Sequence, residues 1–342
     1  MIGRATSRWL PRWLPRWFLG GALLVAGCLG MSRAYLLLSA TADPPPAVGS
    51  TSQPAASIAA IVAEEPITPI QEAPSADPRK VALGEKLFFD PRLSHDGGTS
   101  CNSCHDVRRN GASRNIHDGP IGGTGFPFNT PTLFNAAGNF RLGWQGGFRA
   151  LETQAVASID SPRVMRSSPQ EAAAKLAADP ELARQFHAIY GRDPDPDDLI
   201  DALATFERSL VTPGSRFDRW LMGDTGALGA EELAGYQLFK SVGCISCHQG
   251  ANVGGNLFQR HGIFHPLASP DPPILRVPSL RNVATTAPYF HDGSAPTLET
   301  AVRRMAYAQL DSSLTDQQVG EIVAFLRTLT GDYRGRPVGE GP

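Results

Sequence analysis

Two short runs of the sequence combine thiols and an imidazole at a spacing that fits one kind of chemistry. Cys101-Asn-Ser-Cys104-His105 and Cys244-Ile-Ser-Cys247-His248 both read C-x-x-C-H. In such a run the two cysteines form thioethers with the vinyl groups of a haem, and the adjacent histidine ligates the iron. The two runs therefore predict two covalently attached haem c groups, with His105 and His248 as the proximal iron ligands.

A zinc site or a pair of disulfides is the alternative use of the same four thiols. Cysteine and histidine also ligate zinc, and exported proteins form disulfides. The histidine that directly follows each motif's second cysteine favours haem, as does the export signal described below. Cys28 is the one cysteine outside the two motifs.

The other face of each haem iron is either bound by a second protein ligand or left open. The sequence offers different candidate ligands for the two irons. Met305 follows His248 by 57 residues, and a thioether ligand raises the haem potential and favours electron transfer. Core packing of Met305 and ligation by Tyr307 are the alternatives. After His105, only His117 lies close enough, as an iron ligand or as a surface residue. Without a ligand, the first iron is five-coordinate and open to a small oxidant.

The elements that position these residues are predicted to be helices joined by long loops. Apolar residues recur at helical spacing, and capping residues precede several of these segments. The expected helices cover residues 78–89, 168–178, 199–210, 230–241, 297–309 and 315–329. Residues 96–125 and 251–278 have no clear period and are expected to be loops, and no strand pattern is found. The predicted fold class is mostly α, with two cytochrome-c-like haem domains and long loops.

The two motifs lie about 143 residues apart, and a helix precedes each, which indicates a weak internal repeat. The domains are expected in this order: an export signal or anchor at 1–40, a Pro/Ala-rich tether at 41–77, an N-terminal haem domain at 78–225, a C-terminal haem domain at 226–332, and a tail at 333–342.

The first forty residues predict export. Arginines from Arg4 to Arg16 precede an apolar stretch from Trp17 to Gly27. Val25-Ala-Gly-Cys28 resembles a lipoprotein signal, in which Cys28 becomes the lipidated first residue. The alternative is an uncleaved membrane anchor, because apolar residues resume at 34–40. Both alternatives predict a periplasmic protein tethered to the membrane.

The charge balance of the chain bears on whether the protein binds nucleic acid. The chain is 42% apolar and 19% charged, which is ordinary for a globular protein. Without the five arginines of the first forty residues, 26 basic side chains face 33 acidic ones, a net charge near −7. This balance argues against nucleic acid and permits docking of small basic proteins.

Over residues 78–331 the sequence resembles the bacterial di-haem cytochrome c peroxidases, including the related methylamine-dehydrogenase maturation enzymes. Besides the haem motifs, the resemblance rests on Leu83-Gly-Glu-Lys-Leu-Phe-Phe-Asp-Pro-Arg-Leu-Ser94, Asn129-Thr-Pro-Thr-Leu-Phe-Asn135, Phe217-Asp-Arg-Trp-Leu221, Pro278-Ser-Leu-Arg-Asn282 and Ala287-Pro-Tyr-Phe-His-Asp-Gly293.

The resemblance implies a peroxidase that reduces hydrogen peroxide to water. Peroxide would react at the haem on His105, and electrons from a small periplasmic donor, a cytochrome c or a cupredoxin, would enter at the haem on His248 and Met305. Trp144 occupies the position of the tryptophan that carries electrons between the haems, and Gln154 that of a distal-pocket residue. The family also suggests a homodimer.

The resemblance further implies a calcium ion between the two domains. Its ligands map onto the side chain of Asn129 and the backbone carbonyls of Thr286 and Pro288, completed by water. Oxygen ligands are what a hard cation such as calcium prefers.

The sequence departs from the family in the distal pocket. The family's glutamate, ten residues after the glutamine, falls on Val164, and valine cannot move the proton that peroxide cleavage requires. The distal histidine falls near Ile121, four residues from His117. The usual Trp-Asp-Gly-Arg is Trp144-Gln-Gly-Gly147. Asp160, Arg163 and His117 are the possible substitutes for the missing acid.

Two other functions remain open. The protein could use peroxide to oxidise a partner protein, as the maturation enzymes do, but those enzymes place a tyrosine where Met305 stands. It could instead be a non-catalytic di-haem electron carrier or redox sensor, an alternative that Val164 motivates.

Overall fold

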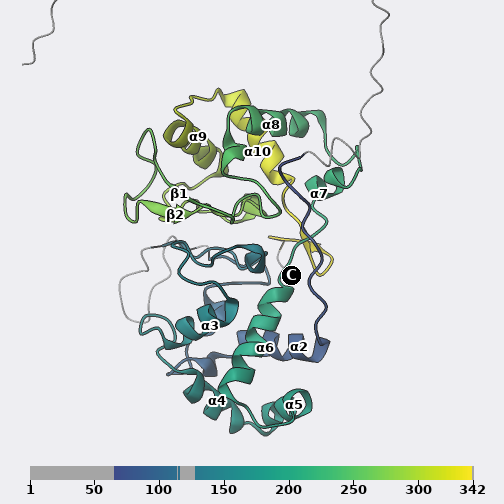
Figure 1. Cartoon of the computed structure of the whole chain (residues 1–342), viewed down its shortest axis with the longest axis vertical. Helices are drawn as coiled ribbons and strands as arrows, with labels where there is room; N and C mark the ends of the chain where they lie inside the picture. The colour runs from purple at the N-terminus through teal and green to yellow at the C-terminus, as the bar shows by residue number, and fades with distance from the viewer. Residues whose placement is uncertain (1–64, 114, 116–127, 341–342) are drawn as a thin grey trace, which may run out of the picture. The chain divides into compact units, whose positions relative to one another are not determined.

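The computed structural model describes residues 65–113, 115 and 128–340 (Figure 1). The chain divides into two units, residues 1–54 and 55–342, and every described residue belongs to the second unit. His117, Ile121, Cys28 and the predicted export signal lie outside the described residues. No described helix is both long and apolar enough to cross a membrane.

The described fold is mostly helical, as predicted. The helices are α2 (Pro78–Phe88), α3 (Leu151–Asp160), α4 (Pro169–Ala177), α5 (Pro180–Tyr190), α6 (Pro196–Ser209), α7 (Arg216–Leu221), α8 (Ala230–Ser241), α9 (Leu298–Leu310) and α10 (Asp316–Arg327). Two short antiparallel hairpins join β1 (Phe258–Arg260) to β2 (Ile274–Arg276) and β3 (Asp332–Tyr333) to β4 (Arg336–Pro337).

Capping residues explain where several helices begin. The Asp77 carboxylate accepts a hydrogen bond from the backbone N–H of Arg79, with Pro78 at the first position of α2. Thr315 and Gln318 form the capping box predicted for α10. All six predicted helices are present. The hairpin of β1 and β2 lies in residues 251–278, which were predicted to be a loop. The sequence pattern did not predict it, because strands of three residues are too short to show an alternating pattern.

Two helix pairs repeat the same packing. Helix α2 crosses α6, and α8 crosses α10 in the same way (Figure 1). A Cβ at Gly84 would overlap the carbonyl oxygen of Ala202, and a Cβ at Gly235 would overlap that of Glu321. Both glycines therefore permit a close approach of backbones that any larger residue would prevent.

The repeat continues through the loops that follow each haem motif. Asn135 and Asn282 both have left-handed backbones, with φ near 60°, and each precedes a short 3-10 helix. Isolated bridges then join Leu142 to Phe148 and Tyr289 to Ala295, with partners 147 residues apart. The backbone thus confirms the internal repeat.

Each repeat has its own apolar core. The first core gathers residues of α2, α4, α5 and α6, among them Leu87, Phe88, Leu176, Phe186 and Phe206. The second core gathers residues of α7, α8, α9 and α10, among them Phe217, Tyr236, Phe239, Phe325 and Leu326. Phe217 and Leu221 precede the predicted domain boundary at residue 225 but pack in the second core. Val338, from the predicted tail, is buried in the first core.

The segment 65–77, predicted as part of a flexible tether, has fixed contacts. Ile67 is 1% exposed and belongs to the second core. The backbone N–H of Gly250 donates to the Pro66 carbonyl at 2.9 Å. The Pro/Ala/Ser composition predicted a flexible tether and did not indicate these contacts, because a single isoleucine and several backbone groups make them.

Candidate haem sites

The two C-x-x-C-H motifs fold into the same tight turn. Cys101–Ser103 and Cys244–Ser246 are single 3-10 turns. The backbone N–H of His105 donates to the Cys101 carbonyl at 3.0 Å, and that of His248 donates to the Cys244 carbonyl at 3.1 Å. Each turn therefore brings two thiols and one imidazole together, as attachment to one haem requires.

Backbone carbonyls orient both imidazole rings. Nδ1 of His105 lies 3.2 Å from the Gly111 carbonyl, and Nδ1 of His248 lies 3.1 Å from the Val253 carbonyl. A proton on Nδ1 that is donated to a carbonyl leaves Nε2 with a lone pair for a metal. Burial also lowers the pKa of His248 to about 4, so this ring is neutral.

The four motif cysteines form no disulfide. Burial raises the pKa of Cys101 well above its usual range and that of Cys244 to about 12, which disfavours the thiolate form that a zinc ligand requires. Among the described residues, no group of three or more His, Cys, Asp and Glu side chains is arranged to hold a metal ion. The zinc alternative therefore lacks a set of ligands in this part of the chain.

A buried arginine that has no acidic partner among the described residues fits the carboxylates of a haem. Arg276 on β2 is 5% exposed, and burial lowers its pKa to about 10. Its side chain donates to two carbonyls, those of Gly143 at 3.2 Å and Val277 at 3.3 Å. A buried cation is costly unless an anion neutralises it. Haem carries two propionates, and Arg276 would neutralise one of them. Sequence analysis missed Arg276, because its burial could not be read from the pattern.

Trp144 connects the two repeats. Its indole N–H donates to the Asn129 carbonyl at 2.7 Å, and its own carbonyl accepts from the backbone N–H of Arg276 at 2.8 Å. Its ring meets the ring of His291 edge-on, with centroids 6.2 Å apart. His291 is 147 residues after Trp144, so the two aromatic rings occupy equivalent positions of the repeat. His291 is buried, and its Nε2 has no hydrogen-bond partner in the part of the chain that the structure describes.

Two of the three predicted calcium ligands, Asn129 and Pro288, lie in contact between the repeats. Nδ2 of Asn129 lies 2.6 Å from the Pro288 carbonyl, while Oδ1 of Asn129 is buried and has no hydrogen-bond partner among the described residues. The amide oxygen and nitrogen can exchange places by a flip. Two oxygens would then face each other, as they do around a hard cation. Thr286 precedes Pro288 by two residues, and oxygens of this kind are the ones that calcium prefers.

Helices α3 and α9 are equivalent and differ where an iron ligand would stand. Leu151 opens α3 and Leu298 opens α9, 147 residues later. The ion pairs Glu152–Arg208 and Glu299–Arg327 tie these helices to α6 and α10 in the same way. In this alignment Met305 of α9 corresponds to Ser158 of α3, and both are half-buried. The first repeat therefore has no methionine at the equivalent position.

The predicted distal residues of the first haem lie on or just after α3. Gln154 is half-buried, one turn before Ser158. Val164 packs against the first core, as does Cys101. Asp160 and Arg163, two of the predicted substitutes for the missing acid, are exposed.

A further carboxyl, which sequence analysis missed, lies near the first motif. Burial raises the pKa of Glu207 to about 8, and its charge raises the pKa of Cys101. Its equivalent in the second repeat, by the register of α6 and α10, is the buried apolar residue Leu326. Only comparison of the two repeats reveals this difference.

Family models match most of the described chain. A di-haem cytochrome c peroxidase model matches residues 78–226, and a cytochrome c model matches residues 233–330.

Individual proteins agree with these models. The cytochrome c551 peroxidase of Nitrosomonas europaea is 41% identical over 81% of this chain and 87% of its own length. The methylamine utilization protein MauG of Methylorubrum extorquens is 31% identical over 92% of both chains. Among solved structures, a MauG-like protein associated with microbial copper homeostasis matches with a TM-score of 0.68 and 26% identity, over 77% of this chain and 94% of its own.

Proposed function

Because the chain belongs to the di-haem cytochrome c peroxidase family, we propose that it reduces hydrogen peroxide to water with electrons from a small periplasmic donor protein. The family carries two covalent haem c groups, and we assign them to Cys101, Cys104 and His105 and to Cys244, Cys247 and His248.

The observation that carries this proposal is the difference between the two repeats. Met305 is available as an iron ligand in the second repeat, and Ser158 replaces it in the first. A serine hydroxyl is a poor iron ligand compared with a thioether. The second haem, on His248, would hold a complete ligand set for electron transfer, and the first, on His105, would keep a face open to peroxide.

The chain's own residues have distinct roles in this reaction. Bound haem supplies iron that accepts and releases single electrons. Trp144, which contacts both repeats, positions an aromatic ring between them. Gln154 would donate a hydrogen bond that orients peroxide on the α3 side. Val164 moves no proton, so the two protons that convert peroxide to two waters come from water or from another side chain.

We assign donor docking to an exposed apolar patch beside α9. Ile263, Phe264 and Tyr307 are all about half exposed. The backbone N–H of Phe264 donates to the Ala308 carbonyl at 2.9 Å, so this loop lies against the helix that carries Met305. An apolar patch next to the electron-entry haem suits a transient complex with a small protein.

A calcium ion between Asn129, Thr286 and Pro288 would hold the two repeats together. Added calcium should raise the melting temperature of the natural protein and leave that of an Asn129→Ala variant unchanged. An equal rise in both proteins would contradict the assignment.

The domain limits, periplasmic location, membrane tether and homodimer are part of the same proposal. Either lipid on Cys28 or an uncleaved N-terminal anchor would provide the tether. Haem attachment to C-x-x-C-H motifs outside the cytoplasm supports the location. Mass measurement of the protein from isolated membranes distinguishes the two anchors.

Val164 is the specific observation that favours the second candidate, a di-haem electron carrier or redox sensor. Steady-state peroxide consumption with a reduced small cytochrome separates the two functions. We expect turnover by the natural protein. No turnover by the natural protein and a clear gain in Val164→Glu would favour the carrier. Oxidation of a partner protein, the activity of the maturation enzymes, is less favoured because Met305 stands in place of their tyrosine.

A further inference from the structure

Residues 65–70, here called the strap, are bound to the second repeat along their length. Ile67 is inserted into the second core with 1% exposure. The Pro66 carbonyl accepts from the Gly250 backbone N–H at 2.9 Å. Glu65 forms a hydrogen bond with the Tyr236 hydroxyl and an ion pair with Lys240 at 3.2 Å. The strap is therefore part of the folded second repeat.

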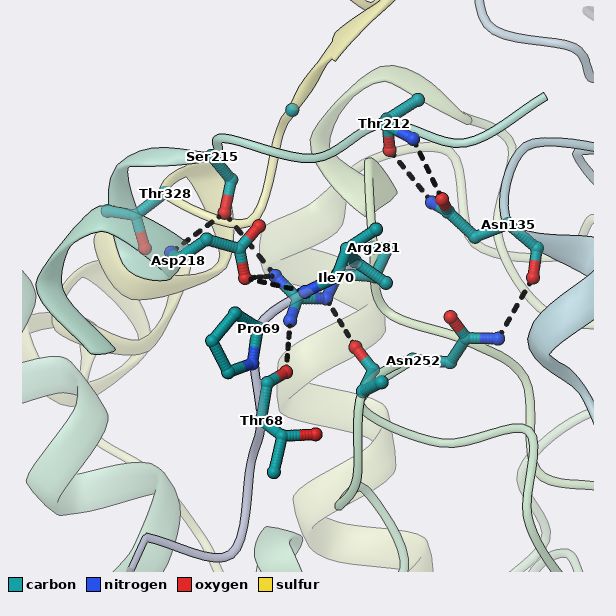
Figure 2. Close-up of polar contacts among 12 residues, drawn as sticks. Thr68, Pro69, Ile70, Asn135, Thr212, Ser215, Asp218, Asn252, Arg281 and Thr328 are labelled. Atoms are coloured by element: carbon teal, nitrogen blue, oxygen red, sulfur yellow. Dashed lines mark hydrogen bonds and ion pairs between the residues drawn. The ribbon is translucent and has the colours of Figure 1, made fainter. Parts of the chain in front are cut away.

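A buried arginine joins the strap to two other segments (Figure 2). Arg281 donates from Nη2 to the Thr68 carbonyl at 2.9 Å and from Nε to the Ala251 carbonyl at 2.7 Å. Nη1 forms an ion pair with Asp218 at 2.8 Å, and both side chains are almost fully buried. The backbone N–H of Ile70 donates to the same Asp218 carboxylate at 3.3 Å.

The loop held in this way follows His248 directly. The strap binds Gly250, and Arg281 binds Ala251. Two residues further along the same loop, the Val253 carbonyl accepts a hydrogen bond from Nδ1 of His248 at 3.1 Å. A backbone N–H within this loop, that of Gly254, donates to the Gln249 carbonyl at 2.9 Å and closes it. The strap and Arg281 therefore fix the backbone that orients the proximal imidazole.

The first repeat lacks this arrangement. Asn135 and Asn282 are equivalent, so Arg281 corresponds to Phe134, which is buried in the first core. The carbonyl that binds His105, that of Gly111, belongs to a loop without a buried arginine contact among the described residues. The device is thus specific to the haem on His248.

We propose that the strap and the Arg281–Asp218 pair are positioning elements that set the potential of the second haem. The inference deepens the proposed function, in which that haem receives electrons. A buried ion pair is weak evidence for stability, because apolar residues of similar volume often replace it without loss. Groups that orient a ligating histidine and exclude water from it do tune a haem. A loosened loop would admit water and stabilise the oxidised haem.

The test is a reductive titration of the haem-loaded full chain, with the two haems followed separately by their visible spectra. Ile67→Ala removes the strap's anchor. Ile159→Ala is the matched control, because Ile159 is also 1% exposed but lies in the first core. The melting temperature should fall by a similar amount in both variants. At a fixed potential, only Ile67→Ala should lower the reduced-to-oxidised ratio of the second haem, by about tenfold, which is 59 mV for one electron.

A double variant removes the ion pair without leaving a buried charge. Arg281→Met with Asp218→Leu should shift the second haem in the same direction and leave the first haem unchanged. Ile67→Val should keep the natural potential. An unchanged second-haem potential in Ile67→Ala, despite its lower melting temperature, would overturn the proposal. The titration uses neither peroxide nor donor, so failure of the peroxidase function would leave its result readable.

Discussion

Single residues make the two haem sites unequal. Ser158 and Met305 stand at equivalent positions, as do Glu207 and Leu326, and Phe134 and Arg281. In the proposed function, the first pair decides whether an iron has a sixth ligand. The second pair places a carboxyl in the first repeat. The third pair gives the second repeat a buried arginine where the first repeat has a phenylalanine. In the proposed function, these single differences within a repeated fold divide peroxide chemistry from electron entry.

Glu207 gives a prediction about pH. Its pKa rises from 4.5 to about 8 because burial penalises the charged carboxylate. Between these values the folded protein holds a proton that the unfolded chain releases, so stability falls as pH rises through this window. Glu207→Gln should flatten the dependence.

Urea unfolding of the loaded protein at several pH values between 4.5 and 8 checks this prediction. Glu299→Gln removes an exposed carboxyl from the other repeat and is the control. The same loss of stability with rising pH in Glu207→Gln and in the natural protein would show that another group is responsible.

Pairs of helices carry the fold, and each pair depends on one glycine. A Cβ at Gly84 would overlap the Ala202 carbonyl, so the helices must separate to accept it. Gly84→Ala should cost about 1–3 kcal/mol of unfolding free energy. Gly320, inside α10, has open space around its Cβ position. Gly320→Ala should therefore gain about 0.5–1 kcal/mol. Denaturant unfolding measures both, and a neutral Gly84→Ala would refute the close packing.

The predicted helices, such as α2 and α10, have caps or regular apolar spacing. Helix α5 has both, with Asp179 as its cap, and was nevertheless not predicted. The short helix α7 was not predicted either. Helix α3 was not predicted, because its small residues give little amphipathic contrast, although it carries Gln154 and Ser158. The anchoring of the strap through Ile67 and the burial of Arg276 could not be predicted either. Both depend on contacts between residues far apart in the chain, which composition and spacing do not record.

At the scale of the whole molecule, the proposed function has electrons entering on the α9 side and leaving at the first haem. Trp144, Arg276 and Asn129 join the repeats along this path. The haem motifs predicted both ends from sequence. The contacts between the ends required the structure, because they link loops more than a hundred residues apart.

The docking patch gives a kinetic prediction at this scale. Phe264→Ser with Tyr307→Ser removes two exposed apolar side chains without touching Met305. The KM for a small donor cytochrome should rise about tenfold, with kcat nearly unchanged, since only the encounter is weakened. Met222→Ser, which removes an exposed residue after α7, is the matched control. Equal effects of the two changes on KM would place docking elsewhere.

The most direct test of the central claim is peroxide turnover by Ser158→Met, compared with Ser158→Ala. The methionine copies the position of Met305 onto α3 and should ligate the first iron. We predict that turnover with a reduced donor falls by about tenfold or more in Ser158→Met, while the first haem becomes low-spin. Ser158→Ala should keep turnover near that of the natural protein. Full turnover in a Ser158→Met variant whose first haem is low-spin would contradict the claim that peroxide reacts at this open face.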